Sequence, residues 1–346
     1  MTTELFVPGR LCLFGEHSDW AGGYRRTCAA LAPGYCLVAG TDQGLRAVAS
    51  RADVVELTTV LPDGGRRASE PMPATGSALA AVARSGSFFS YAAGVAAEVV
   101  ERFGTAGVRL DVVADDLPLG KGLSSSAAIC VLVARAFARV YGLGLSVRDE
   151  MELAYAGERR TGSQCGRMDQ VCAYGRTITF LTFDGERFDV EPVTLGGPIH
   201  LLVVDLRRGK DTRRILADLN ACFPDAPGAV AAGVRDALGP TNAARTAEAR
   251  RALERGDAQA LGALMTDAQT TFDRLVAPAC PELRAPRLHD VLAHPALRDL
   301  GWGGKGVGSQ GDGCAQLVAR GAAERDRLAA TLVADLGVDC LPLTVE

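Results

Sequence analysis

The most constraining feature of this 346-residue chain is the stretch PLGKGLSSSAAICVLVARAF, which runs from Pro118 to Phe137. From Ser125 on, apolar residues follow the 3.6-residue spacing of an amphipathic helix, and Gly142 ends the pattern. Arg135 and Arg139 lie on the polar face, and the apolar face consists of Ile129, Leu132, Val133, Ala136, Phe137 and Val140. Apolar and charged residues alternate before this stretch, in residues 108–114, which is typical of a half-buried strand. The stretch is therefore predicted to join a strand, a glycine-containing turn and a helix that begins near Ser125.

Three consecutive serines stand at the start of this predicted helix, although a helix needs only one capping side chain. Ser124 or Ser125 can serve as that N-cap, which is the purely structural explanation. The alternative is an anion site, because Gly120 and Gly122 let the backbone approach a phosphate and helix N-termini favour negative charge. The residue order differs from the Walker pattern, since no lysine follows the second glycine. We therefore interpret the turn as a phosphate-binding loop of another kind.

Two acidic residues in the segment 154–175 are candidates for the chemistry that such a loop would serve. Glu158 and Asp169 lie on either side of a glycine-containing break. Each acid taken singly is best explained as an exposed helix or turn residue. Phosphoryl transfer, however, needs one carboxylate to hold Mg²⁺ and another to orient or deprotonate the attacking hydroxyl. The segment can supply both.

The N-terminal stretch PGRLCLFGEHSDWAGGY, residues 8–24, concentrates polar groups around an apolar strand. Arg10 stands at the strand start, whereas Glu16, His17 and Asp19 follow its end. A lone histidine is usually structural, but a cluster at a strand end is typical of a cleft where side chains hydrogen-bond a polyol. A further stretch, GGKGVGSQGDGC at 303–314, is rich in glycine, which taken alone is weak support for a ligand site.

Composition argues against several classes of protein. The formal net charge of −4 gives no reason to expect a nucleic-acid partner or an anionic membrane surface. No apolar run approaches the ~18 residues that a membrane span needs, and no secretory signal pattern is present. The ten cysteines are scattered and lack zinc spacing. We expect reduced, mostly buried thiols in a cytoplasmic protein.

The motifs occur in the order found in the GHMP kinase superfamily, which includes galactokinase, homoserine kinase, mevalonate kinase and phosphomevalonate kinase. PGRLCLFGEHSDWAGG resembles the galactokinase version of the first motif, and PLGKGLSSSAA resembles the second. GKGVGSQGDGC resembles the third motif more loosely, and CGRMDQ resembles the galactokinase segment with the catalytic aspartate. The resemblance spans essentially the whole chain.

The resemblance implies an α+β protein with the GHMP kinase fold. Residues 1–195 would form a ribosomal-protein-S5-domain-2-like α/β domain, and residues 196–346 a ferredoxin-like domain. The boundary is placed where the sequence changes from paired strands to a helix-rich region. The paired strands are expected on either side of Asp184-Gly185, a strong hairpin signal. Further strands are predicted at 200–206 and 314–320, and a helix is predicted to close the sequence. The implied activity is ATP- and Mg²⁺-dependent phosphorylation of a sugar at the anomeric hydroxyl, which would give a sugar 1-phosphate.

Individual roles also follow from the resemblance. It implies that Asp169 is the base and that Arg10 orients the acceptor hydroxyl. It implies that Ser126 and Glu158 bind Mg²⁺. The loop over the ATP phosphates corresponds to Gly120, Gly122, Leu123, Ser124, Ser125 and Ser126. The residues that would hold the sugar hydroxyls are Glu16, His17 and Asp19.

The chain departs from the family in its third motif, where Ser309, Gln310 and Asp312 replace glycines, and Trp20 stands where galactokinases usually have tyrosine. A group of basic residues has three interpretations: solvated surface, contact with the ATP phosphates, or, for one or two of them, selection of a carboxylate such as that of a uronic acid. This group consists of Arg25, Arg26, Arg207, Arg208, Lys210, Arg213 and Arg214.

Two alternative functions remain at this point. One is a non-catalytic sensor of the same fold that binds ATP and sugar. The other is a small-molecule kinase of the mevalonate or homoserine type. The intact serines, Glu158 and Asp169 favour an enzyme, and the Glu16-His17-x-Asp19 cluster favours a polyhydroxylated acceptor over mevalonate or homoserine.

Overall fold

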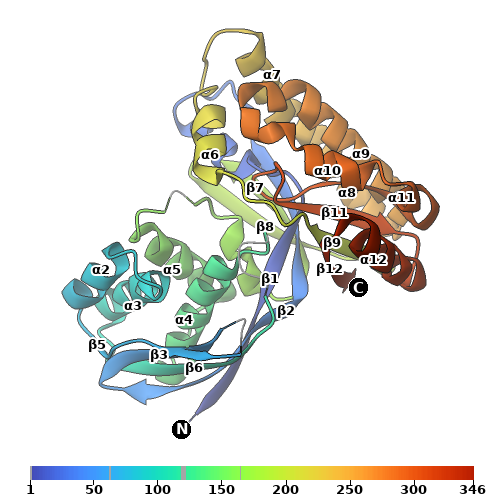
Figure 1. The fold of residues 1–346 in the computed structure, drawn as a ribbon. Coiled ribbons are helices and arrows are strands. Elements are labelled where there is room, and N and C mark those ends of the chain that lie inside the picture. Colours follow the sequence, from blue (N-terminus) through green and yellow to red (C-terminus); the bar gives the residue numbers. More distant parts are fainter. Residues whose placement is uncertain (1, 62–63, 118–121, 164) are drawn as a thin grey trace. The chain divides into compact units, whose positions relative to one another are not determined.

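A computed structural model describes residues 2–61, 64–117, 122–163 and 165–346 (Figure 1). The chain forms two compact units: residues 1–10 with 40–176, called here the first unit, and residues 11–39 with 177–346, the second unit. Two long strands, β1 (Thr3–Phe14) and β2 (Gly34–Ala52), contribute to both. These units are defined by packing and do not test the expected division into kinase domains after residue 195, which stays a prediction.

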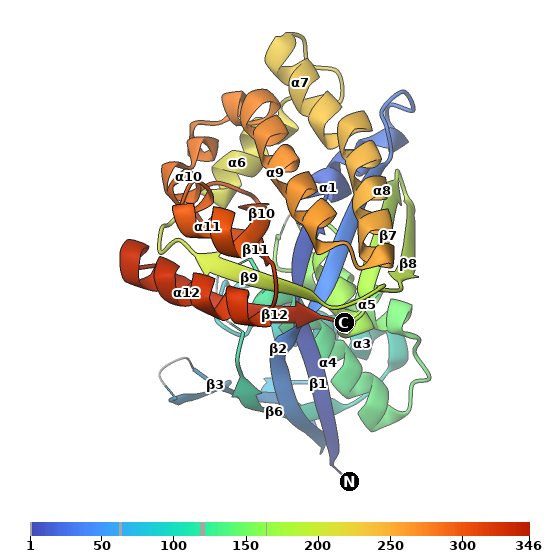
Figure 2. The ribbon, with the colours of Figure 1, turned by 90° about the vertical axis from the view of Figure 1, so that its right-hand side faces the viewer.

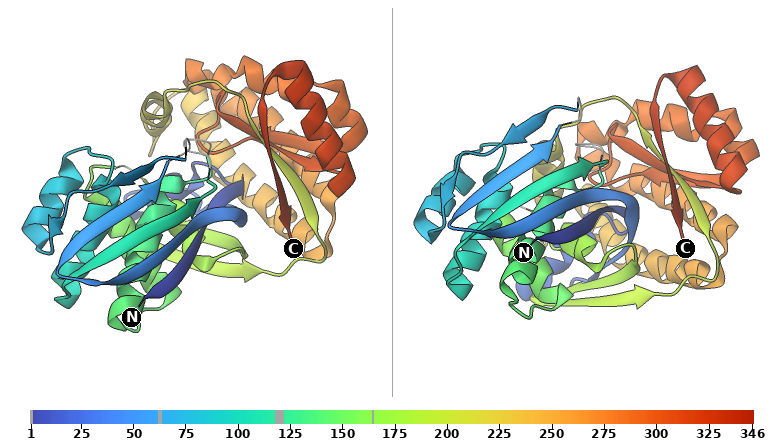
Figure 3. Two further views of the ribbon diagram at one scale, coloured as in Figure 1. Left: turned by 60° about the horizontal axis from the view of Figure 1, so that its bottom comes forward. Right: turned by 90° about the horizontal axis from the view of Figure 1, so that it is seen from below.

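In the first unit, the described residues form a mixed sheet and a layer of helices. Its strands lie in the order β4-β3-β6-β2, β1 pairs with β2, and β5 pairs with β3. Strand β6 covers the predicted residues 108–114, and it is antiparallel to β2 and parallel to β3. The helices lie on one side of β3 and β6 (Figures 1 and 3). The remaining elements are β3 (Val54–Val60), β4 (Arg66–Ala68), β5 (Met72–Pro73), β6 (Gly107–Asp115), α2 (Gly76–Arg84), α3 (Ser90–Phe103), α4 (Ser125–Tyr141), α5 (Val147–Arg159) and the 3₁₀ helix η2 (Asp169–Tyr174).

Helix α4 begins at Ser125 and ends before Gly142, as predicted, with that glycine in the left-handed conformation that closes a helix. It is buried over more of its circumference than its apolar periodicity indicates, because α3 and α5 both pack against it. Cys130, Val131 and Ala134, for example, are fully buried although they lie outside the predicted apolar face. The helix is therefore the centre of the helical layer in the first unit.

The second unit contains a four-stranded antiparallel sheet in the order β10-β11-β9-β12, with α12 alongside it (Figure 2). The predicted hairpin at Asp184-Gly185 is confirmed, since β7 and β8 pair with Asp184 opposite Arg187. The elements are α1 (Ser18–Gly23), η1 (Tyr24–Arg26), β7 (Ile178–Asp184), β8 (Arg187–Val193), β9 (Ile199–Asp205), α6 (Thr212–Asn220), α7 (Ala229–Leu238), α8 (Pro240–Arg255), α9 (Ala258–Leu275), η3 (Ala277–Ala279), η4 (Pro281–Arg284), α10 (Pro286–Leu292), α11 (Pro295–Leu300), β10 (Gly301–Gly306), β11 (Cys314–Ala319), α12 (Ala322–Leu336) and β12 (Asp339–Val345).

Alternate residues of the central strands supply the core beneath α12. Leu202 and Val204 of β9 and Leu317 of β11 pack with Leu328 and Leu332 of that helix. Residues two apart on a strand point to the same face of the sheet, and residues four apart on a helix lie on the same side of the helix. This spacing therefore places one side of α12 on one face of the sheet. The predicted strands at 200–206 and 314–320 and the predicted C-terminal helix are thus confirmed.

All ten cysteines have free thiols, and seven of them are buried. Within the part of the chain that the structure describes, no helix has the length and apolar character that crossing a membrane requires.

Candidate functional site

In the first unit, Arg10 links the turn before α4 to the start of η2. Its Nη2 and Nε donate hydrogen bonds to the same oxygen of Asp169, Oδ1, at 2.6 and 3.1 Å. Its Nη1 donates to the carbonyl of Gly122, and its backbone N–H donates to the carbonyl of Leu123 at 3.1 Å. The side chain of Arg10 is 6% exposed, whereas that of Asp169 is 27% exposed. The carboxylate is therefore held firmly and remains accessible.

The three serines begin α4 without the usual capping geometry. Ser124 is the N-cap residue, but it has left-handed dihedral angles (φ 54°, ψ 52°) and its side chain makes no capping hydrogen bond. An N-cap normally has extended dihedral angles and accepts a bond from a backbone N–H of the first turn. Gly122 also has a positive φ, 76°, which glycine adopts at little energetic cost. The purely structural explanation of the serines is therefore weakened.

Ser125 and Ser126 occupy the first turn of α4, and both are half-buried. Leu123 is buried and anchors the turn. The other glycine expected in this loop, Gly120, lies outside the described residues. The N–H groups of a first helical turn have no acceptor within the helix, so this end of α4 is suited to bind an anion.

Glu158 and Asp169 form a pair of neighbouring acids. Glu158 is buried in the last turn of α5, where its Oε2 accepts a hydrogen bond from Gln170 Nε2 at 2.7 Å. Burial, and secondly the charge of Asp169, raises the pKa of Glu158 to about 7. A cation nearby would relieve both effects, because it favours the ionised carboxylate.

A cation at this place would need further ligands. Among the residues that the structure describes, no group of three or more His, Cys, Asp and Glu side chains is arranged to hold a metal ion. Ser126 is on α4 and Glu158 on α5, two helices that pack against each other. These two side chains fit the magnesium site expected from the sequence only if bound nucleotide and water complete the oxygen ligands that Mg²⁺ prefers.

In the second unit, the cluster after β1 is more enclosed than its sequence suggests. Glu16 follows the tight turn at Gly15 (φ 93°), where a side chain would collide with the backbone of Tyr35. Glu16 is buried and pairs with Lys305 of β10, whose Nζ also donates to the carbonyl of Gly306 at 3.1 Å. The pair borders a cavity of about 40 Å³, which suits a few water molecules rather than a sugar.

His17 and Asp19 complete this cluster. Burial lowers the pKa of His17 to about 4. The Ser309 backbone opposes this shift, and the charges of Lys210 and Lys305 lower the pKa by smaller amounts. The imidazole is therefore neutral at pH 7. Its Nδ1 accepts a hydrogen bond from Trp20 Nε1 at 3.2 Å, and its buried Nε2 makes no hydrogen bond of normal geometry with the described residues. Asp19, on α1, is half-buried.

The residues that depart from the family's third motif have structural contacts in the second unit. Asp312 Oδ1 accepts a hydrogen bond from the backbone N–H of Leu288 in the first turn of α10, at 3.0 Å. The carbonyl of Gln310, a residue with a positive φ of 65°, accepts a bond from Lys210 Nζ at 2.6 Å. Ser309 Oγ lies 3.3 Å from Thr212 Oγ1. The loop between β9 and α6 therefore supports this glycine-rich segment.

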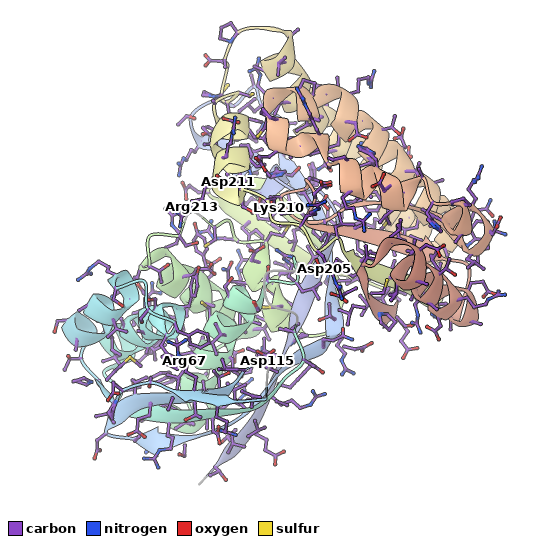
Figure 4. All side chains as sticks on the ribbon, in the orientation of Figure 1. Arg67, Asp115, Asp205, Lys210, Asp211 and Arg213 are labelled. Atoms are coloured by element: carbon purple, nitrogen blue, oxygen red, sulfur yellow. The ribbon has the colours of Figure 1, made fainter. Side chains whose placement is uncertain are left out.

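Most of the basic residues noted in the sequence have acidic or carbonyl partners. Arg25 pairs with Asp184, Arg207 with Asp339 and Arg214 with Asp218. Figure 4 shows Lys210 and Arg213 on either side of Asp211, where the chain enters α6. These contacts favour the solvated-surface interpretation for the paired arginines, while Arg208 and Arg213 are exposed.

The structure thus brings Arg10, Gly122, Glu158 and Asp169 together in the first unit. In the second unit it brings Glu16 and His17 close to Lys305. Sequence reasoning gave no role to Lys305. The signal was available, because Lys305 is the lone cation inside an otherwise glycine-rich stretch.

Comparison with known proteins identifies the fold. Residues 90–176 match the family model described as the GHMP kinases N terminal domain. The chain is similar in structure to Lactococcus lactis galactokinase complexed with galactose (18% identity, 99% of this chain and 93% of that chain, TM-score 0.72). It is also similar to L. major mevalonate kinase in complex with R-mevalonate (17%, 100% and 96%, TM-score 0.73).

A third similar structure contains a nucleotide analogue: Streptococcus pneumoniae phosphomevalonate kinase in complex with phosphomevalonate and AMPPNP (16%, 98% and 99%, TM-score 0.70). At these identities the likeness concerns the fold, which confirms the α+β class predicted from the sequence. This chain has the GHMP kinase fold, and its residues 90–176 match the model of the N-terminal domain of that family.

Proposed function

We propose that this protein is an ATP-dependent kinase that phosphorylates a hydroxyl group of a sugar, with Asp169 as the base. The observation that carries the proposal is the contact between Arg10 and Asp169 beside the glycine-serine turn. It joins an accessible carboxylate, a fixed cation and a helix N-terminus suited to phosphate. These are the groups that positioning and charge stabilisation in phosphoryl transfer require.

In this proposal the turn of Gly120, Gly122, Leu123 and Ser124–Ser126 binds the ATP phosphates through backbone N–H and hydroxyl groups. The acceptor oxygen attacks the γ-phosphorus and forms a new P–O bond. The bond from that phosphorus to the β,γ-bridging oxygen breaks, and ADP leaves with the electron pair. The acceptor proton passes to the carboxylate of Asp169.

Arg10 has two jobs in this scheme. Because two of its nitrogens bond to one oxygen of Asp169, the second carboxylate oxygen keeps a defined direction toward the acceptor. Because its third nitrogen bonds to the carbonyl of Gly122, the same side chain sets the distance between the base and the phosphate loop. The planar guanidinium makes these contacts from three separate nitrogens in a fixed geometry, whereas a lysine would have to make them from one.

Mg²⁺ would be held by Ser126 and Glu158 together with phosphate oxygens. When bound, it would neutralise charge on the transferring phosphoryl group. The support from this chain is the raised pKa of Glu158, which marks a buried carboxyl that a cation would stabilise as its anion. Glu158→Gln should raise the Mg²⁺ concentration that gives the half-maximal rate, and should weaken the Mg²⁺-dependent part of ATP binding measured by calorimetry. An unchanged Mg²⁺ dependence in both measurements would place the metal elsewhere.

A polyhydroxylated acceptor is proposed because of the groups after β1. His17 is a buried neutral imidazole, and Asp19 is a half-buried carboxylate, so together they can accept and donate hydrogen bonds. Glu16 contributes indirectly if its pair with Lys305 persists on binding. The galactokinase of similar fold contains galactose, which supports this choice, whereas the similar mevalonate kinase supports the competing one.

The test is ATP turnover against galactose, glucose, arabinose, their uronates, mevalonate and homoserine, with phosphorus NMR to locate the new ester. We expect a sugar 1-phosphate from a neutral hexose or a close relative. Phosphorylation of mevalonate or homoserine alone would overturn the sugar assignment and leave the kinase intact. If ATP and a sugar bind without turnover of any acceptor, the protein is a sensor rather than an enzyme.

A further inference from the structure

Arg135 makes contacts in the first unit that the proposed chemistry has not used. It lies on α4, its side chain is 13% exposed, and each end of its guanidinium has a partner. Nε donates to Glu150 Oε2 at 2.8 Å, Nη1 donates to the carbonyl of Phe6 at 3.0 Å, and Nη2 donates to the carbonyl of Ala173 at 2.7 Å. One planar group therefore fixes three directions at once.

The three partners lie on the three other elements that carry the proposed site. Phe6 is on β1, the strand that also carries Arg10. Ala173 is on η2, the short helix that begins with Asp169. Glu150 is on α5, the helix that ends near Glu158. Arg135 itself is on α4, whose first turn holds Ser125 and Ser126. No other contact described in this unit joins all four elements through one side chain.

The buried charges at Arg135 are unusual if stability is their only purpose. Glu150 is fully buried and also has Arg139 Nη1 at 3.3 Å from its Oε1. A buried ion pair contributes little net stability compared with an apolar pair of the same size, since both charges lose their hydration. What the pair does supply is a fixed orientation of the guanidinium. The carbonyl of Ala173 is thereby held at a set distance from α4.

We propose that Arg135 is a positioning residue for the reaction and that it acts through Asp169. By holding η2 against α4, β1 and α5, it keeps the base at its working distance from the phosphate turn. This inference rests on the proposed function, because it assigns Asp169 the role of base. A displacement of about 1 Å in such a group can lower a rate by about 100-fold.

The experiment compares Arg135→Lys with the matched control Arg235→Lys. The lysine keeps the charge beside Glu150 and loses the bonds to the carbonyls of Phe6 and Ala173. In the second unit, Arg235 likewise bonds two carbonyls, those of Cys222 and Ala226, with its Nη1. We expect Arg135→Lys to lower kcat at least about tenfold with the KM for ATP within about twofold, and Arg235→Lys to leave kcat unchanged.

A second comparison uses the Asp169→Asn background. If Arg135 acts through Asp169, Arg135→Lys should lose its effect there, so that the two substitutions are strongly non-additive. A general structural role would lower the rate by the same factor in both backgrounds. That result, or a kcat no lower than that of Arg235→Lys, would overturn the inference.

Two further measurements separate the possible failures. If Asp169→Asn alone has no effect on turnover, the proposed role of Asp169 fails, and the inference that Arg135 acts through it fails with it; if Asp169→Asn lowers turnover but Arg135→Lys keeps its effect in that background, only the inference fails. If Arg135→Lys does not fold, Glu150→Gln serves instead, because it keeps an acceptor for Arg135 Nε and removes the charge that orients it. We then expect a smaller loss of kcat, which again disappears in the Asp169→Asn background; a loss that persists there overturns the inference.

Discussion

Two cation–carboxylate pairs, one in each unit, have similar chemistry and different surroundings. Arg10 and Asp169 join β1 to η2 in the first unit, and Lys305 and Glu16 join β10 to the turn after β1 in the second. The carboxylate side chain is 27% exposed in the first pair and 7% exposed in the second. Asp169 can therefore meet a solute, whereas Glu16 is enclosed by its own unit.

The difference indicates how one kind of interaction serves two purposes. Where the pair is enclosed, removing one partner leaves an unpaired buried charge, so its loss affects folding. Where the carboxylate is accessible, water can solvate it when the partner is lost, so its loss affects chemistry more than folding. The predictions below test this contrast, beginning with the largest expected effect.

Asp169→Asn should lower turnover by about 100- to 10,000-fold, the usual consequence of losing a general base. Asparagine has the same shape and retains an oxygen that can accept bonds from Arg10, so the melting temperature should change little. Steady-state kinetics and thermal unfolding of the same preparation measure the two effects. The matched control is Asp339→Asn, since Asp339 also accepts a bond from an arginine, Arg207 Nε at 2.8 Å. A turnover near that of the control would remove Asp169 from the mechanism.

Lys305→Met should lower the free energy of unfolding by about 3–5 kcal/mol, the usual cost of leaving one member of a buried ion pair uncompensated. Denaturant unfolding of the variant and the parent measures this loss. The double variant Glu16→Gln with Lys305→Met removes the stranded charge and should be more stable than Lys305→Met alone. A loss below about 1 kcal/mol would show that Glu16 is solvated, and the contrast between the two pairs would disappear.

Glu158 in the first unit and His17 in the second should make the free energy of unfolding depend on pH in opposite directions. The pKa of Glu158 is about 7 in the folded protein and ordinarily 4.5, so its contribution declines as pH rises from about 4.5 to 7. The pKa of His17 is about 4 and ordinarily 6.5, so its contribution declines as pH falls from about 6.5 to 4. Each effect amounts to at most about 3.4 kcal/mol, at 1.36 kcal/mol for each pKa unit.

Two variants separate these effects. Glu158→Gln should remove the loss of stability toward neutral pH, and His17→Asn should remove the loss toward acid pH, since asparagine tolerates the left-handed backbone at position 17. Melting temperatures from pH 4.5 to 8 provide the measurement. If the curves of melting temperature against pH were parallel for the parent and both variants, neither Glu158 nor His17 would have a shifted pKa.

The helices and strands with a clear apolar periodicity were predictable from the sequence. Helix α4, strand β6 and the hairpin of β7 and β8 follow from local spacing and from Gly142 and Asp184-Gly185. Local signals could not reveal that Arg10 would meet Asp169, because the contact joins segments far apart in the chain. There the family resemblance, rather than periodicity, placed both residues in one site.

Other features depend on tertiary packing and had no local signal. The sequence reads Arg135 as the polar face of an amphipathic helix, whereas α4 is packed between α3 and α5 and the arginine bonds inward. Glu16 reads as a ligand-binding acid because nothing nearby in the sequence shows that Lys305 pairs with it. Asp312 stands out in the sequence only as a departure from the third motif, whereas in the structure it accepts the N–H of Leu288 at the start of α10.

The smallest effect is expected for the exposed pair of Arg207 and Asp339, whose side chains are 59% and 57% exposed. Asp339→Asn removes the charge and should change the free energy of unfolding far less than Lys305→Met does, because water and salt screen exposed charges. Even that change should shrink between low and high ionic strength, unlike the loss caused by Lys305→Met. Denaturant unfolding of both variants at two salt concentrations makes the comparison. If Asp339→Asn lowered the free energy of unfolding as much as Lys305→Met, burial would not explain the difference between exposed and enclosed ion pairs. The accessibility of Asp169 would then no longer indicate a catalytic rather than a structural role.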